Sequence, residues 1–182
     1  VSSLQVEDTN PDVISGGYVF KSDDPPEADE VFFSGARQQV IMVYPGKRSL
    51  ALPQRAAQFN YVRNYFNDFS NALFGVNFTN PVSGYAPYID VDSWIDHAMV
   101  SITTFNVDAI RLSGYFYKDR GKPMEMGPVW DCDRSLGSTD TRQINPRFWR
   151  GQGGDGGTDY FNAPGPGPAH HWFPQLFRDI NF

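Results

Sequence analysis

The spacing of apolar residues changes from a helical to a strand period near residue 106, and this change constrains the fold most. From residue 92 or 93, apolar residues recur at steps of three and four, and they predict a helix face made of Ile95, Ala98, Met99 and Ile102. Residues 111–117 alternate like a strand, residues 118–122 form a charged turn, and residues 123–130 predict the returning strand. A helix followed by a β-hairpin predicts a fold of the α+β class.

The rest of the chain predicts further strands and helices around this unit. Strands are expected at residues 31–33 and 40–44, where β-branched and aromatic runs are bounded by Gly and Pro. A long helix is expected from Pro53, with an apolar stripe of Phe59, Val62, Phe66, Phe69 and Leu73. Residues 137–170 are rich in Gly, Pro and Asn and predict a long loop, and a short helix is expected after residues 170–173.

The composition excludes several classes of function. With 40% hydrophobic and 15% aromatic residues among 182, the chain has enough apolar material for a sizeable core. Its 15 Lys and Arg against 21 Asp and Glu give a net charge of −6, which is the opposite of a nucleic-acid binder. No stretch approaches the roughly 18 apolar residues of a membrane-spanning helix. Cys132 is the only cysteine, which excludes an internal disulfide and a cysteine-rich zinc site.

Two aspartates flank the predicted hairpin and carry the most informative chemistry. Asp108 lies just before the hairpin, and Asp131 lies where it ends, so the paired strands are expected to bring these carboxylates within several ångströms. Neighbouring carboxylates repel unless a cation lies between them, and Mg²⁺ typically uses one or two carboxylates plus substrate phosphates. The alternative is that these aspartates only end a helix and a strand. Asp133 could likewise be a turn cap or a ligand of a second metal.

The order helix, Asp, hairpin, Asp is also the order found in phosphoryl-transfer enzymes of the protein-kinase type. There the first Asp positions the acceptor hydroxyl, a polar residue five positions later helps to hold metal, and the second Asp binds Mg²⁺ at the nucleotide phosphates. The fifth position after Asp108 is Ser113, an oxygen ligand weaker than the usual Asn. Arg111 and Lys118 are candidate partners of the phosphates, although each could also be a solvated or ion-paired strand residue.

The residues around this hairpin resemble the signature of the CotH family, named for a bacterial spore-coat protein and regarded as atypical secreted protein kinases. The specific part is the stretch from residue 88 to residue 133, which includes the segments 88–96, 106–109, 111–113, 115–119 and 127–133. A weaker resemblance extends from Gly16 to Asp179. The sequence departs from the family at Cys132, where Phe is common, at Lys21, where an acidic residue is frequent, and at residues 134–137.

This resemblance implies an ATP-dependent transferase with a kinase-like fold, in which Asp108 is the catalytic-type aspartate and Asp131 binds metal. Residues 1–48 are expected to be the strand-rich end of the N-terminal lobe and the hinge. Residues 49–182 are expected to form most of the helical C-terminal lobe, with the catalytic hairpin at 108–133. The chain is expected to be one domain that continues beyond both ends, because a convincing nucleotide-lobe lysine is missing and the glycines of 151–157 lack a phosphate-loop ending.

The leading hypothesis is therefore phosphoryl transfer from ATP to protein Ser/Thr hydroxyls. Mg²⁺ or Mn²⁺ on Asp131, with Asp133 and Ser113, would neutralise the developing charge while Asp108 positions the acceptor. The protein substrate would be a coat or surface protein, since the family resemblance implies an extracellular, cell-surface or spore-surface location. Two alternatives remain open. One is a cell-surface binding or adhesion module without turnover, and the other is a glycosidase with Asp108 and Asp131 as its acid–base pair.

Overall fold

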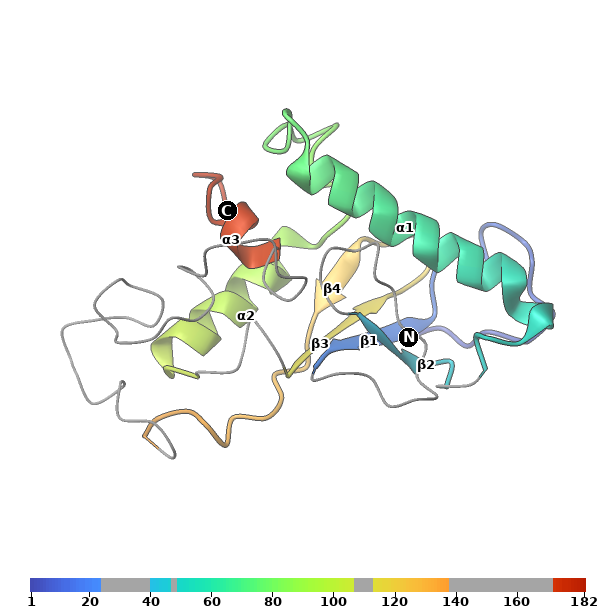
Figure 1. The fold of residues 1–182 in the computed structure, drawn as a ribbon, viewed down its shortest axis with the longest axis horizontal. Helices are drawn as coiled ribbons and strands as arrows, with labels where there is room; N and C mark the ends of the chain where they lie inside the picture. Colours follow the sequence, from blue (N-terminus) through green and yellow to red (C-terminus); the bar gives the residue numbers. More distant parts are fainter. Residues whose placement is uncertain (24–39, 47–48, 107–112, 138–171) are drawn as a thin grey trace.

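The computed structural model describes residues 1–23, 40–46, 49–106, 113–137 and 172–182, and these form a mixed α+β fold (Figure 1). The strands are β1 (Tyr18–Ser22), β2 (Ile41–Tyr44), β3 (Gly114–Lys118) and β4 (Met124–Met126). The helices are α1 (Ala56–Phe74), α2 (Val91–Thr103) and α3 (Trp172–Leu176), and a 3-10 turn, η2 (Pro53–Arg55), leads into α1. The α+β class is confirmed. The predicted strand at 31–33 and the loop from residue 138 to 170 lie outside the described residues.

The strands of the described part form an antiparallel sheet in the order β2-β1-β3-β4. Burial alternates along β1 and β3, and both strands turn the side chains of Phe20 and Phe116 into the core. Because β1 pairs with β3 along its whole length, strands from before and after residue 48 share one sheet. The assignment of residues 1–48 and 49–182 to two lobes stays a prediction.

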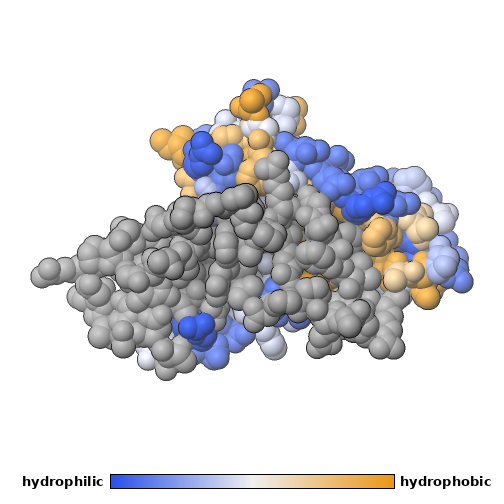
Figure 2. Space-filling view, viewed as in Figure 1, coloured by the Kyte–Doolittle hydropathy of each residue, from blue (hydrophilic) through white to orange (hydrophobic). Residues whose placement is uncertain are grey.

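The long first helix has the stripe that the sequence predicts. Val62, Phe66, Phe69 and Leu73 are buried, and Phe59 is half-buried at the edge of the core. Pro53 opens the preceding 3-10 turn, where its missing N–H group leaves no donor unpaired. The opposite side of α1 is exposed, and hydrophilic side chains gather along this helix in Figure 2. None of the helices in the described part is long and apolar enough to cross a membrane.

The second helix buries the predicted Ala98 and half-buries Ile95 and Ile102, but the rest of its core face differs from the prediction. Asp90 caps it by accepting a hydrogen bond from the Ser93 N–H at 2.9 Å, so the helix begins one residue earlier than expected. Its core face consists of Trp94, His97, Ala98 and Ser101, whereas Met99 is 54% exposed. The prediction of Met99 in the core was wrong because Trp94 brings the largest apolar side chain to the sheet, where its indole N–H donates to the Met124 carbonyl at 3.1 Å.

His97 lies buried in this face with neither ring nitrogen hydrogen-bonded, and its ring stacks against Phe173. Burial lowers its pKa to about 4, so the folded state keeps the imidazole neutral where the unfolded chain, with an ordinary value of 6.5, takes up a proton. Stability is therefore expected to fall as the pH drops from about 6.5 to about 4, by up to about 3 kcal/mol from this residue.

Urea denaturation at several pH values tests this expectation with the variant His97→Leu, which keeps the side-chain volume and cannot titrate. As the pH drops across this range, the free energy of unfolding should decrease more for the wild type than for the variant. The variant should also be as stable as the wild type or more stable at neutral pH, because a buried polar group without a partner is removed. Equal pH dependence in the two proteins would contradict the assignment.

The predicted hairpin is present, but its first strand runs from Gly114 to Lys118 and its returning strand is much shorter than expected. The strand β4 ends at Met126, and the ladder makes its last bond from the Gly127 N–H to the Tyr115 carbonyl at 2.8 Å. The pairing cannot continue through Pro128 because proline has no N–H group to donate. Residues 127–134 therefore leave the sheet and carry Asp131 away from the strand.

Candidate active site

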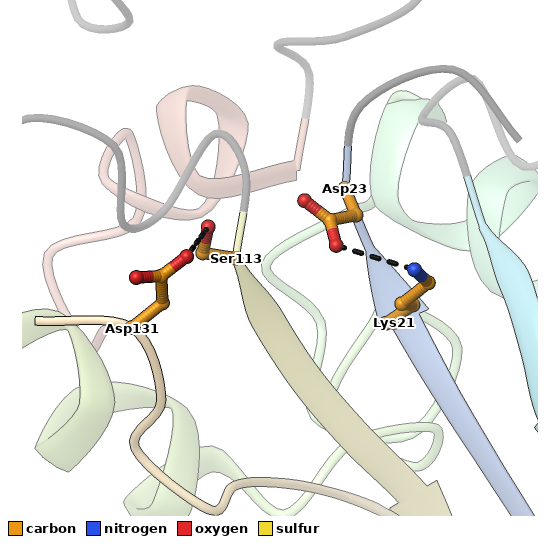
Figure 3. A network of polar contacts seen from close by, with 4 residues as sticks. All are labelled: Lys21, Asp23, Ser113 and Asp131. Atoms are coloured by element: carbon orange, nitrogen blue, oxygen red, sulfur yellow. Dashed lines mark hydrogen bonds and ion pairs between the residues drawn. The ribbon is translucent and has the colours of Figure 1, made fainter.

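Ser113 and Asp131 meet where the two ends of the hairpin come together (Figure 3). Ser113 directly precedes β3, and its hydroxyl donates a hydrogen bond to Oδ2 of Asp131 at 3.2 Å. The serine is buried, whereas the aspartate is exposed. Of the residues predicted for the site, this pair is brought together by the structure. Asp108 and Arg111 lie outside the described residues, so their positions stay predictions.

The backbone around this pair is held in an uncommon conformation. Within the described ranges, the non-glycine residues with positive φ are Phe105 at 51°, Ser113 at 53°, Asp131 at 56° and Leu136 at 51°. All four belong to segments that meet here, since the Leu136 N–H donates to the Thr104 carbonyl at 3.0 Å. Each such residue costs about 1–3 kcal/mol, and such costs gather at sites where function needs a fixed geometry. This clustering supports a functional role independently of any sequence motif.

A charged pair at the end of β1 lies beside Ser113 and Asp131. The register pairs Ser22 with Gly114, so Asp23 follows opposite Ser113 at the same end of the sheet. Nζ of Lys21 forms an ion pair with Oδ2 of Asp23 at 3.3 Å, and Figure 3 shows this pair next to the Ser113–Asp131 contact. Among the described residues, this end of the sheet thus carries the ammonium of Lys21 and the carboxylates of Asp23 and Asp131. The sequence did not assign Lys21 or Asp23 to the site, because their position depends on pairing with a distant strand.

Lys118 lies at the opposite end of β3 from Ser113. Its ammonium is buried and donates to the carbonyls of Ser15 at 2.7 Å and Asp119 at 3.0 Å, and it lies 5.2 Å from the ring centroid of Tyr65. Burial lowers its pKa to about 8, although the nearby Asp119 acts in the other direction. The side chain holds the segment before β1 against the hairpin. This placement lends no support to the prediction that Lys118 binds phosphate.

The chain around Asp131 is open to solvent. Trp130 is 55% exposed and packs edge to face against Tyr115, with the ring centroids 5.6 Å apart. Cys132 and Asp133 are also exposed. The residues that the structure describes contain no group of three or more His, Cys, Asp or Glu side chains that could hold a metal ion.

The donor set of the described residues fits a particular kind of cation site. Mg²⁺ is commonly bound by one or two carboxylates together with substrate phosphates, so it does not need a complete protein cage. The exposed carboxylate of Asp131, with one oxygen oriented by Ser113, meets this requirement. The donors suit an ion that arrives with a nucleotide better than a permanently bound structural metal.

These features define a mixed α+β protein with an antiparallel four-stranded sheet in its described part, whose hairpin presents an aspartate to solvent beside a serine hydroxyl. A family model described as CotH kinase protein matches residues 17–181, and the chain therefore belongs to the CotH kinase family. Membership implies a kinase-like fold, suggests atypical kinase activity and implies the use of ATP and a metal ion. No curated protein and no solved structure matches the chain.

Proposed function

We propose that the protein transfers the γ-phosphoryl group of ATP to Ser/Thr hydroxyls of a protein substrate. The observation that carries the proposal is the contact between Ser113 and the exposed Asp131 at the end of the hairpin, in a chain of the CotH kinase family. A phosphoryl-transfer enzyme needs positioned groups and charge stabilisation more than covalent chemistry from the protein. An exposed carboxylate held in place by a neighbouring hydroxyl supplies such a group.

In this proposal, the side chains around the hairpin have separate roles. Asp131 and Asp133 hold Mg²⁺ or Mn²⁺, which neutralises charge on the phosphates when it is bound. Ser113 orients the Asp131 carboxylate, and Asp108 orients the acceptor hydroxyl and accepts its proton. The amide of Asn106, which stands two residues before Asp108 in the sequence, contacts the main chain of Asp131.

The proposed substrate and location follow from the resemblance of the sequence to secreted members of the family, and Arg111 is a candidate from its place beside Asp108 in the sequence. Arg111 is proposed as a partner of the nucleotide phosphates. The protein substrate is proposed to be a coat or surface protein, and the enzyme is proposed to act at the cell or spore surface.

A radiolabel assay tests the proposed reaction in the complete protein. Incubation with ATP labelled at the γ-phosphate and a Ser/Thr-rich protein acceptor, with Mg²⁺ or Mn²⁺, should label the acceptor on serine or threonine. Chelation of the metal should abolish this transfer. A binding module would show no transfer with either ion, and a glycosidase would need no divalent metal.

Asp108→Asn is expected to separate phosphate transfer from nucleotide binding. Loss of a positioned proton acceptor typically lowers the rate on the order of 10²- to 10⁴-fold. The rise in melting temperature caused by ATP and Mg²⁺ should persist, because Asp131 still holds the metal. The control Asp68→Asn makes the same charge change at an exposed position on α1 and should leave both readouts unchanged. Transfer at the wild-type rate by the Asp108 variant would exclude its proposed role.

A further inference from the structure

The second helix ends in a turn that sends the next residue inward. The Asn106 N–H donates to the Ser101 carbonyl at 3.0 Å, and the Phe105 N–H donates to the Ile102 carbonyl at 3.2 Å. These two bonds are those of a Schellman motif, in which the left-handed position is usually glycine. Here Phe105 occupies that position with φ of 51°. The surroundings must hold this bulky residue in a conformation that costs it energy, so the direction of the chain at Asn106 is fixed.

Asn106 uses this direction to contact Asp131. Its side chain is only 2% exposed, and Nδ2 donates a hydrogen bond to the main-chain carbonyl of Asp131 at 3.3 Å. Ser113 contacts the carboxylate of the same residue. Asp131 is therefore held at its main chain from one end of segment 107–112 and at its side chain from the other end. Asp131 itself has a positive φ, so its local conformation needs such support.

The chemistry of the contact requires a hydrogen-bond donor at this position. A carbonyl oxygen accepts hydrogen bonds and cannot donate them, so its buried partner must carry an N–H or O–H group. An aspartate of the same shape would place two acceptors against each other, and an apolar side chain would leave the carbonyl without this donor. Asn106 also stands two residues before Asp108 in the sequence. It is therefore linked to Asp108 through the chain and to Asp131 through a hydrogen bond.

We propose that Asn106 is a positioning residue of the phosphoryl-transfer site. Its amide fixes the main chain of Asp131 relative to the segment that carries Asp108, and thereby aims the Asp131 carboxylate. This inference rests on the proposed function. It assigns Asn106 no contact with metal or nucleotide, and it distinguishes this residue from Ser113, which acts on the carboxylate directly.

Two variants separate the hydrogen bond from side-chain packing. Asn106→Leu keeps the volume and removes the donor, whereas Asn106→His offers a ring N–H group at a similar distance from the main chain. We expect Asn106→Leu to weaken Mn²⁺ binding in the presence of ATP by about 10- to 100-fold, as the loss of groups that orient metal ligands typically does. Asn106→His should restore most of the affinity. Electron paramagnetic resonance of free Mn²⁺ measures the affinity of each variant. If the Leu side chain prevents folding, Asn106→Ala takes its place as the variant without a donor.

The outcomes decide the inference in either direction. Wild-type Mn²⁺ affinity in the variant without a donor overturns it, as does a His variant that binds as weakly as the Leu variant. If the wild type binds no Mn²⁺, the metal role of the proposed function fails. The contact between Asn106 and Asp131 is then tested by hydrogen exchange at the amides of Ser135 and Leu136, which follow Asp131. Faster exchange in Asn106→Leu with wild-type exchange in Asn106→His supports the positioning role, and equal exchange in all three proteins overturns it.

Discussion

Asp131→Asn is expected to lower phosphate transfer by at least about 100-fold and to abolish the metal-dependent rise in melting temperature with ATP. The substitution keeps the size of the side chain, and its amide oxygen can still accept the hydrogen bond of Ser113. The variant therefore removes the negative charge that a divalent cation needs while leaving the hairpin in place. Transfer from labelled ATP and a thermal-shift titration with ATP and Mg²⁺ measure the two losses.

Two further substitutions make this result specific. Asp68→Asn changes the charge by the same amount on the exposed side of α1 and should behave like the wild type. Asp133→Asn removes the second proposed ligand, two residues away, and should cause a smaller loss than Asp131→Asn. If Asp131→Asn keeps both transfer and the nucleotide-dependent thermal shift, the metal role of Asp131 is excluded.

Trp172→Ala is expected to lower the free energy of unfolding by about 3–5 kcal/mol, as truncation of a large buried aromatic residue typically does. The indole packs against the rings of Phe69, Trp94 and Phe116, with centroids 5.4, 5.7 and 5.6 Å apart. It therefore joins α3 to α1, α2 and the sheet at one point. Since folded domains are stable by only about 5–15 kcal/mol, this loss would be a large share of the total.

Equilibrium urea denaturation followed by circular dichroism measures this loss. Phe177→Ala provides the control, because this ring follows the same helix and is 38% exposed. The control should lose much less stability than Trp172→Ala. A loss within about 1 kcal/mol for Trp172→Ala would show that the core relaxes around the missing ring and that α3 is held by other contacts.

The elements that depend on nearby residues could be predicted from the sequence. The stripe of α1 and the β3–β4 hairpin are encoded within 20 residues or so, and both are present. The helix α2 was found, but its buried face was predicted only in part, because Trp94 and His97 pack into the core beside Ala98 although the pattern favoured Met99. The end of the returning strand depended on the missing N–H of Pro128, a local signal that the pattern of residues 123–130 obscured.

The candidate site was predictable only in part. The spacing from Asp108 identified Ser113, which the structure places against Asp131. Asn106 was missed because its inward direction arises from a helix-ending turn in which Phe105 takes the place of the usual glycine. No sequence pattern marks a phenylalanine for that conformation.

The order of the strands also determines when the site can be assembled. The hairpin of β3 and β4 closes a short loop, whereas β1 must find β3 across about 90 residues of intervening chain, which is a slower step in folding. Lys21 and Asp23 reach Ser113 and Asp131 only through this late pairing. During synthesis on the ribosome, the complete charged end of the sheet cannot form until residues beyond Asp131 have left the exit tunnel. The protein therefore presents this surface only after most of its core has been made.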